Sequence, residues 1–207
     1  MKQLLPCLCL LFLLSCKDKP KPIVDTKTKG AEKLVPMEED DPINNYAAVD
    51  VSPMDMSYYP VDYPKLKMAN AISTSPLVRV IYSRPHLQRR HFNDILKYNE
   101  PWRLGANEST EIEFFKSVKV QDQKVSPGRY IIYCIPEADK WTIILNSNID
   151  TWGLKQDSTR DVHRFPIPIT RNNPTLEYFT MVFEKTGTGA DLLMGWDDVV
   201  GKLPLTF

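Results

Sequence analysis

Past residue 75 the sequence is a succession of short segments in which apolar and polar side chains alternate. Alternation is typical of a β-strand with one face buried and one face in water, because successive side chains point to opposite sides. Only HFNDILKY at 91–98 suggests a helix, and a short one, so no crossover helix of the kind that joins parallel strands is expected. The clearest strand segments are LVRVIYS at 77–83, STEIEFFKS at 109–117, KWTIILN at 140–146 and EYFTMVFE at 177–184.

These strands are therefore expected to pair antiparallel. With VKV, RYIIYCIP, VHRFPIPI, ADLLMGW and KLPLTF counted as further strands, the sequence predicts an all-β domain at residues 70–207, an antiparallel β-sandwich of about eight or nine strands. The polar stretch VQDQKV at 120–125 predicts a hairpin. A domain of this size buries roughly two thirds of the surface of its unfolded chain, which is enough to fold without disulfides.

The N-terminus has the pattern of a secretory signal. One early lysine precedes an apolar run that is shorter than the ~20 residues of a membrane-spanning helix, so residues 1–15 are expected to be a signal peptide. The motif LLSC, which ends at Cys16, resembles the bacterial lipobox, in which the cysteine thiol receives diacylglycerol before cleavage on its N-terminal side. The alternative is an ordinary signal peptide that contains cysteines. The lipobox predicts a lipoprotein of the cell envelope, held in the outer membrane through lipidated Cys16 and facing the periplasm or the cell surface.

Two segments of different composition lie between this anchor and the domain. Residues 16–48 are rich in Lys, Pro and Thr and then acidic, so we expect a flexible tether that holds the domain on the order of 25 to 30 Å from the membrane. Residues 49–69 add Met and Tyr to their prolines, and we expect an extended arm that packs on the domain. The alternative, chelation of a cation by the aspartates of this arm, lacks the Gly and terminal Glu of a regular Ca²⁺ loop.

Charge and cysteine content exclude several functions. The positive charges of 26 Lys and Arg residues balance the negative charges of 26 Asp and Glu residues, so no general attraction to nucleic acid is expected. The sequence contains no HExxH motif and no phosphate-binding glycine loop, so we predict no cofactor and no metal. Once the signal peptide is removed and Cys16 is acylated, Cys134 is the remaining thiol. It lies within RYIIYCIP, where a core position is expected rather than a nucleophile.

Several short motifs together resemble a known family. They are, in order, YSRP at 82–85, WRLGANESTEIEF at 102–114, PGRYIIYCIP at 127–136, KWTIILN at 140–146 and TWGL at 151–154. In these motifs the sequence resembles the domain-of-unknown-function 2911 family over roughly residues 50–207. The members of that family are largely secreted or lipid-anchored bacterial proteins without an assigned activity, so the resemblance implies a location and a fold, and no mechanism.

The loop before the strand at 109–117 supplies the candidate binding residues. If the alternation of that strand continued backwards, Glu108 would face the core, where a carboxylate needs a cation such as Arg84 or Arg103. One reading is an arginine–carboxylate network that fastens the loop. The other is a pocket with an aromatic platform and an arginine fork for a carboxylate or sugar acid. The candidate residues are Arg84, Trp102, Arg103, Asn107 and Glu108.

Two classes of function remain open at this point. The first is a binding or structural module of the envelope, with a small polar or carbohydrate ligand. The second is an envelope hydrolase or lyase that acts on a glycan-like substrate. In it Glu108 would be the acid or base, and Arg84 would adjust the acidity of Glu108. The sequence has no nucleophile elbow and assigns no catalytic residue.

Overall fold

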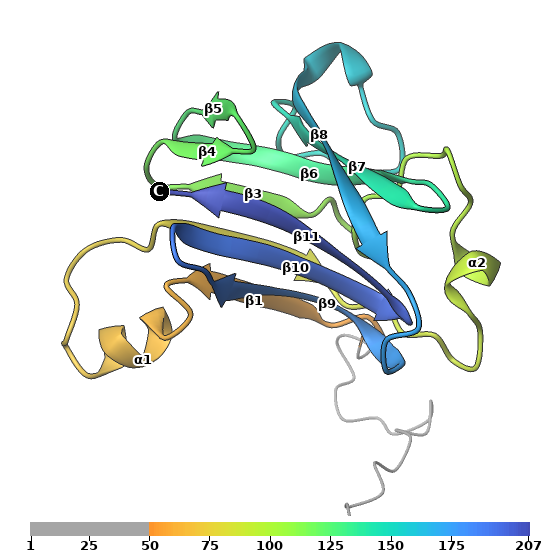
Figure 1. Ribbon diagram of the computed structural model, residues 1–207, viewed down its shortest axis with the longest axis horizontal. Coiled ribbons are helices and arrows are strands. Elements are labelled where there is room, and N and C mark those ends of the chain that lie inside the picture. Colours follow the sequence, from red (N-terminus) through yellow and green to blue (C-terminus); the bar gives the residue numbers. More distant parts are fainter. Residues whose placement is uncertain (1–49) are drawn as a thin grey trace, which may run out of the picture. The chain divides into compact units, whose positions relative to one another are not determined.

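The computed structural model describes residues 50–207 (Figure 1). The predicted signal peptide, the lipidation site Cys16 and the expected tether lie outside the described residues. Within them the chain is built mostly from antiparallel strands, and the all-β prediction is confirmed. None of the helices in the described part is both long enough and apolar enough to cross a bilayer.

The elements are short, as the sequence pattern indicates. The hairpin predicted at 120–125 is present as β4 and β5, and the helix predicted at 91–98 is present as α2. The helices are α1 (Tyr63–Met68), α2 (Phe92–Ile95) and the 3-10 turn η1 (Ser158–Arg160). The strands are β1 (Met54–Tyr59), β2 (Val78–Ser83), β3 (Glu111–Phe114), β4 (Val118–Val120), β5 (Gln123–Val125), β6 (Gly128–Pro136), β7 (Lys140–Asn146), β8 (Asp161–Thr170), β9 (Leu176–Lys185), β10 (Gly189–Asp197) and β11 (Val199–Thr206).

Nine strands form one continuous path in the order β1-β2-β3-β6-β7-β8-β11-β10-β9, and the β4–β5 hairpin attaches to β11. Strand β8 pairs with β7 along most of its length and then with β11 at Ile169 and Thr170. It therefore passes from one layer to the other, and the sheet becomes nearly closed and barrel-like (Figure 1). The main path has the number of strands that the sequence predicts, and the small hairpin raises the total to eleven.

The apolar face of each strand is the buried one. In β3, for example, Ile112 and Phe114 are buried and the two glutamates that alternate with them are half-buried. Burial of one such side chain contributes about 1.5 to 3 kcal/mol to the free energy of folding. The largest aromatic side chains gather near α2, where their rings are stacked or meet edge to face. They are Phe92, Trp102, Trp141, Phe179 and Trp196.

The segment expected to be an arm contains β1 and α1. Strand β1 is the first strand of the path and pairs with β2 along its whole length, from Met54 opposite Ser83 to Tyr59 opposite Val78. Its prolines lie just outside the strand, at Pro53 and Pro60, where they remove no hydrogen bond from the ladder. The segment is thus an edge strand followed by one turn and a short helix.

The two ends of the path, β1 and β9, meet without a shared ladder within the described part of the chain. Side chains close this edge instead. The hydroxyl of Ser57 on β1 donates to the carbonyl of Met181 on β9 at 2.6 Å, and that of Tyr59 on β1 donates to the carbonyl of Gly189 on β10 at 2.8 Å. The backbone N–H of Met181 donates to the Tyr82 hydroxyl at 2.9 Å. The barrel is therefore closed here by side-chain contacts, and some backbone groups of both edge strands stay unpaired across the seam.

Candidate ligand-binding site

The structure places the candidate residues in different surroundings. Trp102 is 7% exposed, and its ring lies in the aromatic cluster with its Nε1 donating to the carbonyl of Gly105 at 3.3 Å. The backbone of Trp102 pairs with that of Cys134 in both directions. Burial raises the pKa of the Cys134 thiol well above its ordinary value, and the predicted core position of Cys134 is confirmed. Trp102 is part of the core rather than a platform on the surface.

Glu108 is exposed, and the expectation that it faces the core is wrong. Strand β3 begins at Glu111, and the segment before it is irregular, with left-handed backbone at Leu104 and Asn107. The alternation therefore cannot be continued back past Thr110, which is still buried and donates its hydroxyl to the carbonyl of Leu104 at 2.6 Å. The extrapolation failed because side-chain period is a property of extended backbone, which ends at this point.

Arg84 pairs with Asp55 instead of Glu108. Its Nη1 lies 3.2 Å from the Asp55 carboxylate, its Nε donates to the carbonyl of Phe179 at 3.2 Å, and its Nη2 donates to the hydroxyl of Thr180 at 3.1 Å. Arg84 thus fastens β9 to the end of β2. The pair is about one third exposed, so its contribution to stability is small, in the range of about 0 to 1 kcal/mol.

The surroundings of the neighbouring Tyr82 phenol raise its pKa to about 12. Burial is the largest cause and the Asp55 carboxylate acts in the same direction, while the N–H of Met181 and the charge of Arg84 oppose the shift. The phenol therefore stays protonated well above the neutral range, and its oxygen accepts the N–H of Met181 on β9. The cluster of Asp55, Tyr82 and Arg84 therefore has a structural role.

The two remaining candidates fasten their own loop. The Arg103 guanidinium donates to the carbonyl of Asn107 at 2.6 Å, and the Asn107 amide donates to the carboxylate of Asp50. Asn107 has a φ of 58°, a conformation that asparagine tolerates better than most residues. The five candidates are therefore divided among the core, the β1–β9 seam, this loop and the surface, and they do not line one common hollow.

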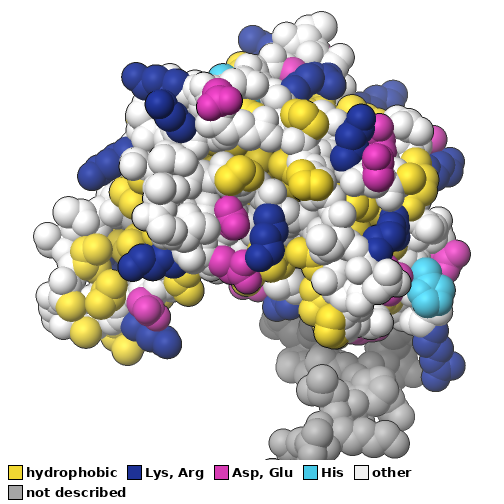
Figure 2. Space-filling view, in the orientation of Figure 1, with side chains coloured by type: hydrophobic (Ala, Val, Ile, Leu, Met, Phe, Trp, Pro, Cys, Tyr) yellow, Lys and Arg dark blue, Asp and Glu magenta, His cyan; other side chains and the backbone are white. Residues whose placement is uncertain are grey.

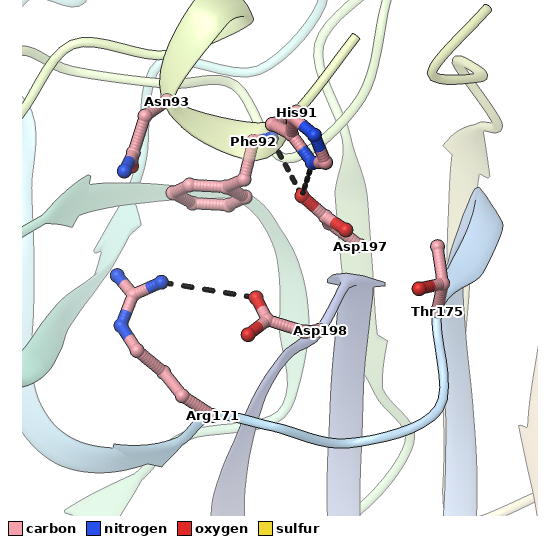
Figure 3. A pocket seen from close by; sticks show the side chains of 7 residues that line it. All are labelled: His91, Phe92, Asn93, Arg171, Thr175, Asp197 and Asp198. Carbon is pink, nitrogen blue, oxygen red and sulfur yellow. Dashed lines mark hydrogen bonds and ion pairs between the residues drawn. The ribbon is translucent and has the colours of Figure 1, made fainter. Parts of the chain in front are cut away.

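A hollow of about 360 Å³ lies elsewhere, between α2, the β8–β9 loop and the β10–β11 turn. All of its lining side chains except that of Phe92 are polar, as Figure 3 shows. Arg171 and Asp198 lie beside each other on one wall, and the ring of Phe92 forms another. The full lining is His91, Phe92, Asn93, Arg171, Thr175, Asp197 and Asp198.

Asp197 holds one side of the hollow together. It occupies a two-residue hairpin turn with a φ of 54°, which aspartate accepts more readily than most residues. Its buried carboxylate accepts the backbone N–H of Phe92 at 2.9 Å and lies 3.3 Å from Nδ1 of His91. The imidazole itself is 81% exposed. The result is a solvent-facing histidine whose orientation is set by a buried carboxylate.

Arg171 forms the opposite side. Its Nη2 donates to the Tyr98 hydroxyl at 2.6 Å, and its Nη1 lies 3.8 Å from the carboxylate of Asp198. Asp198 in turn accepts the backbone N–H of Asn172 at 3.1 Å. Both charged side chains are about one third exposed, so each can accept a further partner from solvent.

A comparison with protein families identifies the chain. The family model described as a protein of unknown function, DUF2911, matches residues 64–205. The chain belongs to the DUF2911 family. This confirms the resemblance found in the sequence motifs, and the matched range contains every residue that lines the hollow. Neither the search of curated proteins nor that of solved structures found a match.

The hollow of this DUF2911 domain offers hydrogen-bond donors and acceptors and carries no metal-binding cluster. Within residues 50–207 no group of three or more His, Cys, Asp and Glu side chains is arranged to hold an ion. Arginine, asparagine and threonine donate, the carboxylate of Asp198 accepts, and His91 can do either. Paired donors and acceptors of this kind suit a ligand with several hydroxyl groups.

None of the residues that line the hollow is among the candidates that the sequence motifs provide. Asp197 and Asp198 form a tight hairpin turn, in which Asp197 is buried. The available signal was the pair of aspartates between two alternating segments, which marks a tight hairpin turn. That signal gives the position of the turn, and it does not reveal that α2 packs against it.

Proposed function

We propose that this DUF2911 protein is a lipid-anchored binding module of the cell envelope, and that it binds a small polyhydroxylated ligand, such as a saccharide, in the hollow beside α2. The lipobox at Cys16 supports the anchor. The observation that carries the binding function is the hollow of about 360 Å³ in which the exposed parts of His91, Asn93, Arg171 and Asp198 face one space.

The geometry favours a neutral or weakly charged ligand. Arg171 and Asp198 lie on the same wall and largely compensate each other, so a strongly charged ligand would meet both attraction and repulsion. Hydroxyl groups can accept from the guanidinium and donate to the carboxylate at once. The walls that face the ligand are held by Asp197 and Tyr98, and such fixed partners reduce the entropy that binding costs.

The binding test uses the thermal stability of the protein against a panel of neutral and acidic mono- and disaccharides. A ligand at a hundred times its Kd raises the free energy of unfolding by about 2.7 kcal/mol and shifts the melting temperature upward. Arg171→Ala should abolish the shift. Arg103→Ala is the matched control, because its guanidinium bonds within the loop at Asn107 and lies outside the hollow. Loss of binding in the control alone, or no shift with any saccharide, would contradict the proposal.

The anchor has its own test. Cys16→Ser should remove acylation and move the protein from the membrane fraction to the soluble or unprocessed fraction. Mass spectrometry of the mature wild-type protein should show a diacylated or triacylated Cys16. An unmodified cysteine would refute the anchor without bearing on the saccharide site.

A second candidate function is an envelope hydrolase or lyase on a glycan-like substrate. The observation that favours it is the pair of exposed His91 and buried Asp197, since a carboxylate that orients an imidazole is a common arrangement in general acid–base catalysis. Neither a hydrogen bond nor an ion pair joins Glu108 to Arg84, the residues first considered for this role, among the described residues. Glycan turnover that is lost in His91→Gln while binding is retained would favour the enzyme.

A further inference from the structure

Residues 61–75, which we call the α1 lobe, protrude from the barrel between β1 and β2 (Figure 1). The lobe contains α1 and the loop that leads to β2. None of its residues is buried, although it includes five large apolar or aromatic side chains that are exposed or half-buried. Isolated helices of this length are unstable in water, and this one packs no side chain into the core of its own domain. It therefore has an apolar surface without a partner in the described chain.

Exposed apolar side chains lie on this lobe and beside it. Met68 is 82% exposed and Val61 is 54% exposed. A groove of about 160 Å³ adjoins them between β1, α1 and β9, and its lining includes the exposed side chains of Met56 and Val182. Figure 2 shows the hydrophobic side chains of this lobe clustered at the lower left of the molecule. The protruding tip of the domain therefore carries apolar side chains next to an apolar groove.

Basic and aromatic side chains surround that surface. Lys65 is almost fully exposed, with only a distant contact of 3.9 Å to Asp62, and Lys67 reaches the carbonyl of Ser73 at 3.4 Å. Tyr63 is packed against the ring of Tyr58 at a centroid distance of 5.5 Å. Lysines that extend from an apolar patch, with tyrosine at its border, are typical of segments that lie in the interface of a bilayer.

We propose that the α1 lobe contacts the anionic surface of the membrane directly. Met68 and Val61 enter the boundary between head groups and acyl chains, and Lys65 and Lys67 bind lipid phosphates. The charge of the lobe, two lysines against Asp62, fits an anionic surface. This inference rests on the proposed lipid anchor, whose expected flexible tether lets the domain approach the bilayer, and it is independent of the saccharide site. The acyl chains would hold the protein on the membrane, and the lobe would add a second, weaker attachment that fixes the orientation of the domain.

The test uses the full acylated protein in vesicles of phosphatidylethanolamine and phosphatidylglycerol. In Met68→Cys a polarity-sensitive fluorophore can be attached selectively, because Cys134 is buried and Cys16 is expected to be acylated. The matched control is Trp152→Cys, an apolar side chain that is 57% exposed on the loop between β7 and β8. We expect the probe at Met68 to shift its emission to the blue and to lose quenching by aqueous iodide, and the probe at Trp152 to keep both properties.

The outcomes separate this proposal from the anchor. Protein that floats with the vesicles while the Met68 probe stays open to iodide overturns the lobe contact and leaves the anchor intact. Protein that does not float overturns both. The double change Lys65→Glu and Lys67→Glu should restore iodide quenching at Met68 without releasing the protein, and a probe that stays shielded in it contradicts the role of the lysines. Shielding that occurs without vesicles and rises with protein concentration would show a protein contact, and would also refute the proposal. Val61→Cys provides a second probe if Met68→Cys does not fold.

Discussion

The two short α-helices of the domain differ in what holds them. Helix α2 has four residues, and Phe92 lies fully buried with its ring stacked on Trp141 at 5.8 Å. Its first turn is also bonded to Asp197. Helix α1 has six residues, and none of them is buried. Both are far shorter than a helix that is stable alone, so local propensity explains neither of them. The difference shows that α2 is part of the core, whereas α1 is presented to the surroundings.

This contrast separates the two proposed sites. The hollow lies beside the helix that is tied to the core, where fixed side chains can recognise a small ligand with little loss of entropy. The lobe lies at the helix that is not tied, where a broad apolar surface can meet a partner without a specific shape. Substitutions in the two helices should therefore differ in their effect on stability.

Phe92→Ala should cause the largest loss of stability. Removing a fully buried ring from an aromatic cluster leaves a cavity, and changes of this kind cost roughly 3 to 5 kcal/mol in the free energy of unfolding. The measurement is a denaturant melt of the purified protein. A loss below about 1 kcal/mol would mean that α2 is no better anchored than α1, and the contrast would fail.

Asp197→Ala should rank second, with a loss of roughly 1 to 3 kcal/mol from the buried N–H of Phe92 that it leaves unpaired. The left-handed backbone at this position adds about 1 kcal/mol, because alanine tolerates it poorly. Asp197→Asn is the control, since it keeps an acceptor and tolerates the same backbone. If both variants lose the same stability, the carboxylate does more than accept this bond.

A pH titration asks whether β1, the strand that leads into α1, is itself held firmly. The pKa of Tyr82 is raised from 10.0 to about 12, so the fold favours the neutral phenol. Its contribution is therefore complete below pH 10.0 and is lost as the pH rises through about 12. Two pKa units correspond to about 2 to 3 kcal/mol. Tyr82→Phe should have a shallower alkaline loss of stability than the wild type, whereas parallel curves would show that the phenol does not fasten the seam.

Met68→Ser should have the smallest effect in solution. The side chain is mostly exposed and packs against nothing in the core, so the free energy of unfolding should change by less than about 0.5 kcal/mol. The same denaturant melt makes the comparison with Phe92→Ala direct. A loss above about 1 kcal/mol would show that α1 packs on its own domain and would remove the apolar surface on which the membrane proposal depends.

Much of the fold could be predicted because strand alternation is a local property. The segments at 77–83, 109–117, 140–146 and 177–184 each contain a strand whose apolar face is buried. The 120–125 hairpin could also be predicted, because turn residues act over a few positions. Alternation carries no information on where a strand begins, and for this reason Glu108 was expected in the core although extended backbone starts only at Glu111.

The candidate site could not be predicted in the same way, because its contacts join distant parts of the chain. The bond from Phe92 to Asp197 spans 105 positions, and the bond from Arg171 to Tyr98 spans 73. No local pattern distinguishes Asp197, which is buried, from the adjacent Asp198, which is partly exposed. Only the packing of α2 against the barrel decides that Asp197, and not Asp198, accepts the backbone N–H of Phe92.

The sequence by itself determined the class of the fold, the faces of the strands and the family, since these depend on side-chain period and on short contiguous motifs. Tertiary structure alone decided the strand order, the passage of β8 between layers and the side-chain seam between β1 and β9. It also decided that α2 buries Phe92 whereas α1 buries none of its residues. The physical reason is that burial and hydrogen bonding depend on which surfaces meet, and those surfaces come from segments that the chain brings together only on folding.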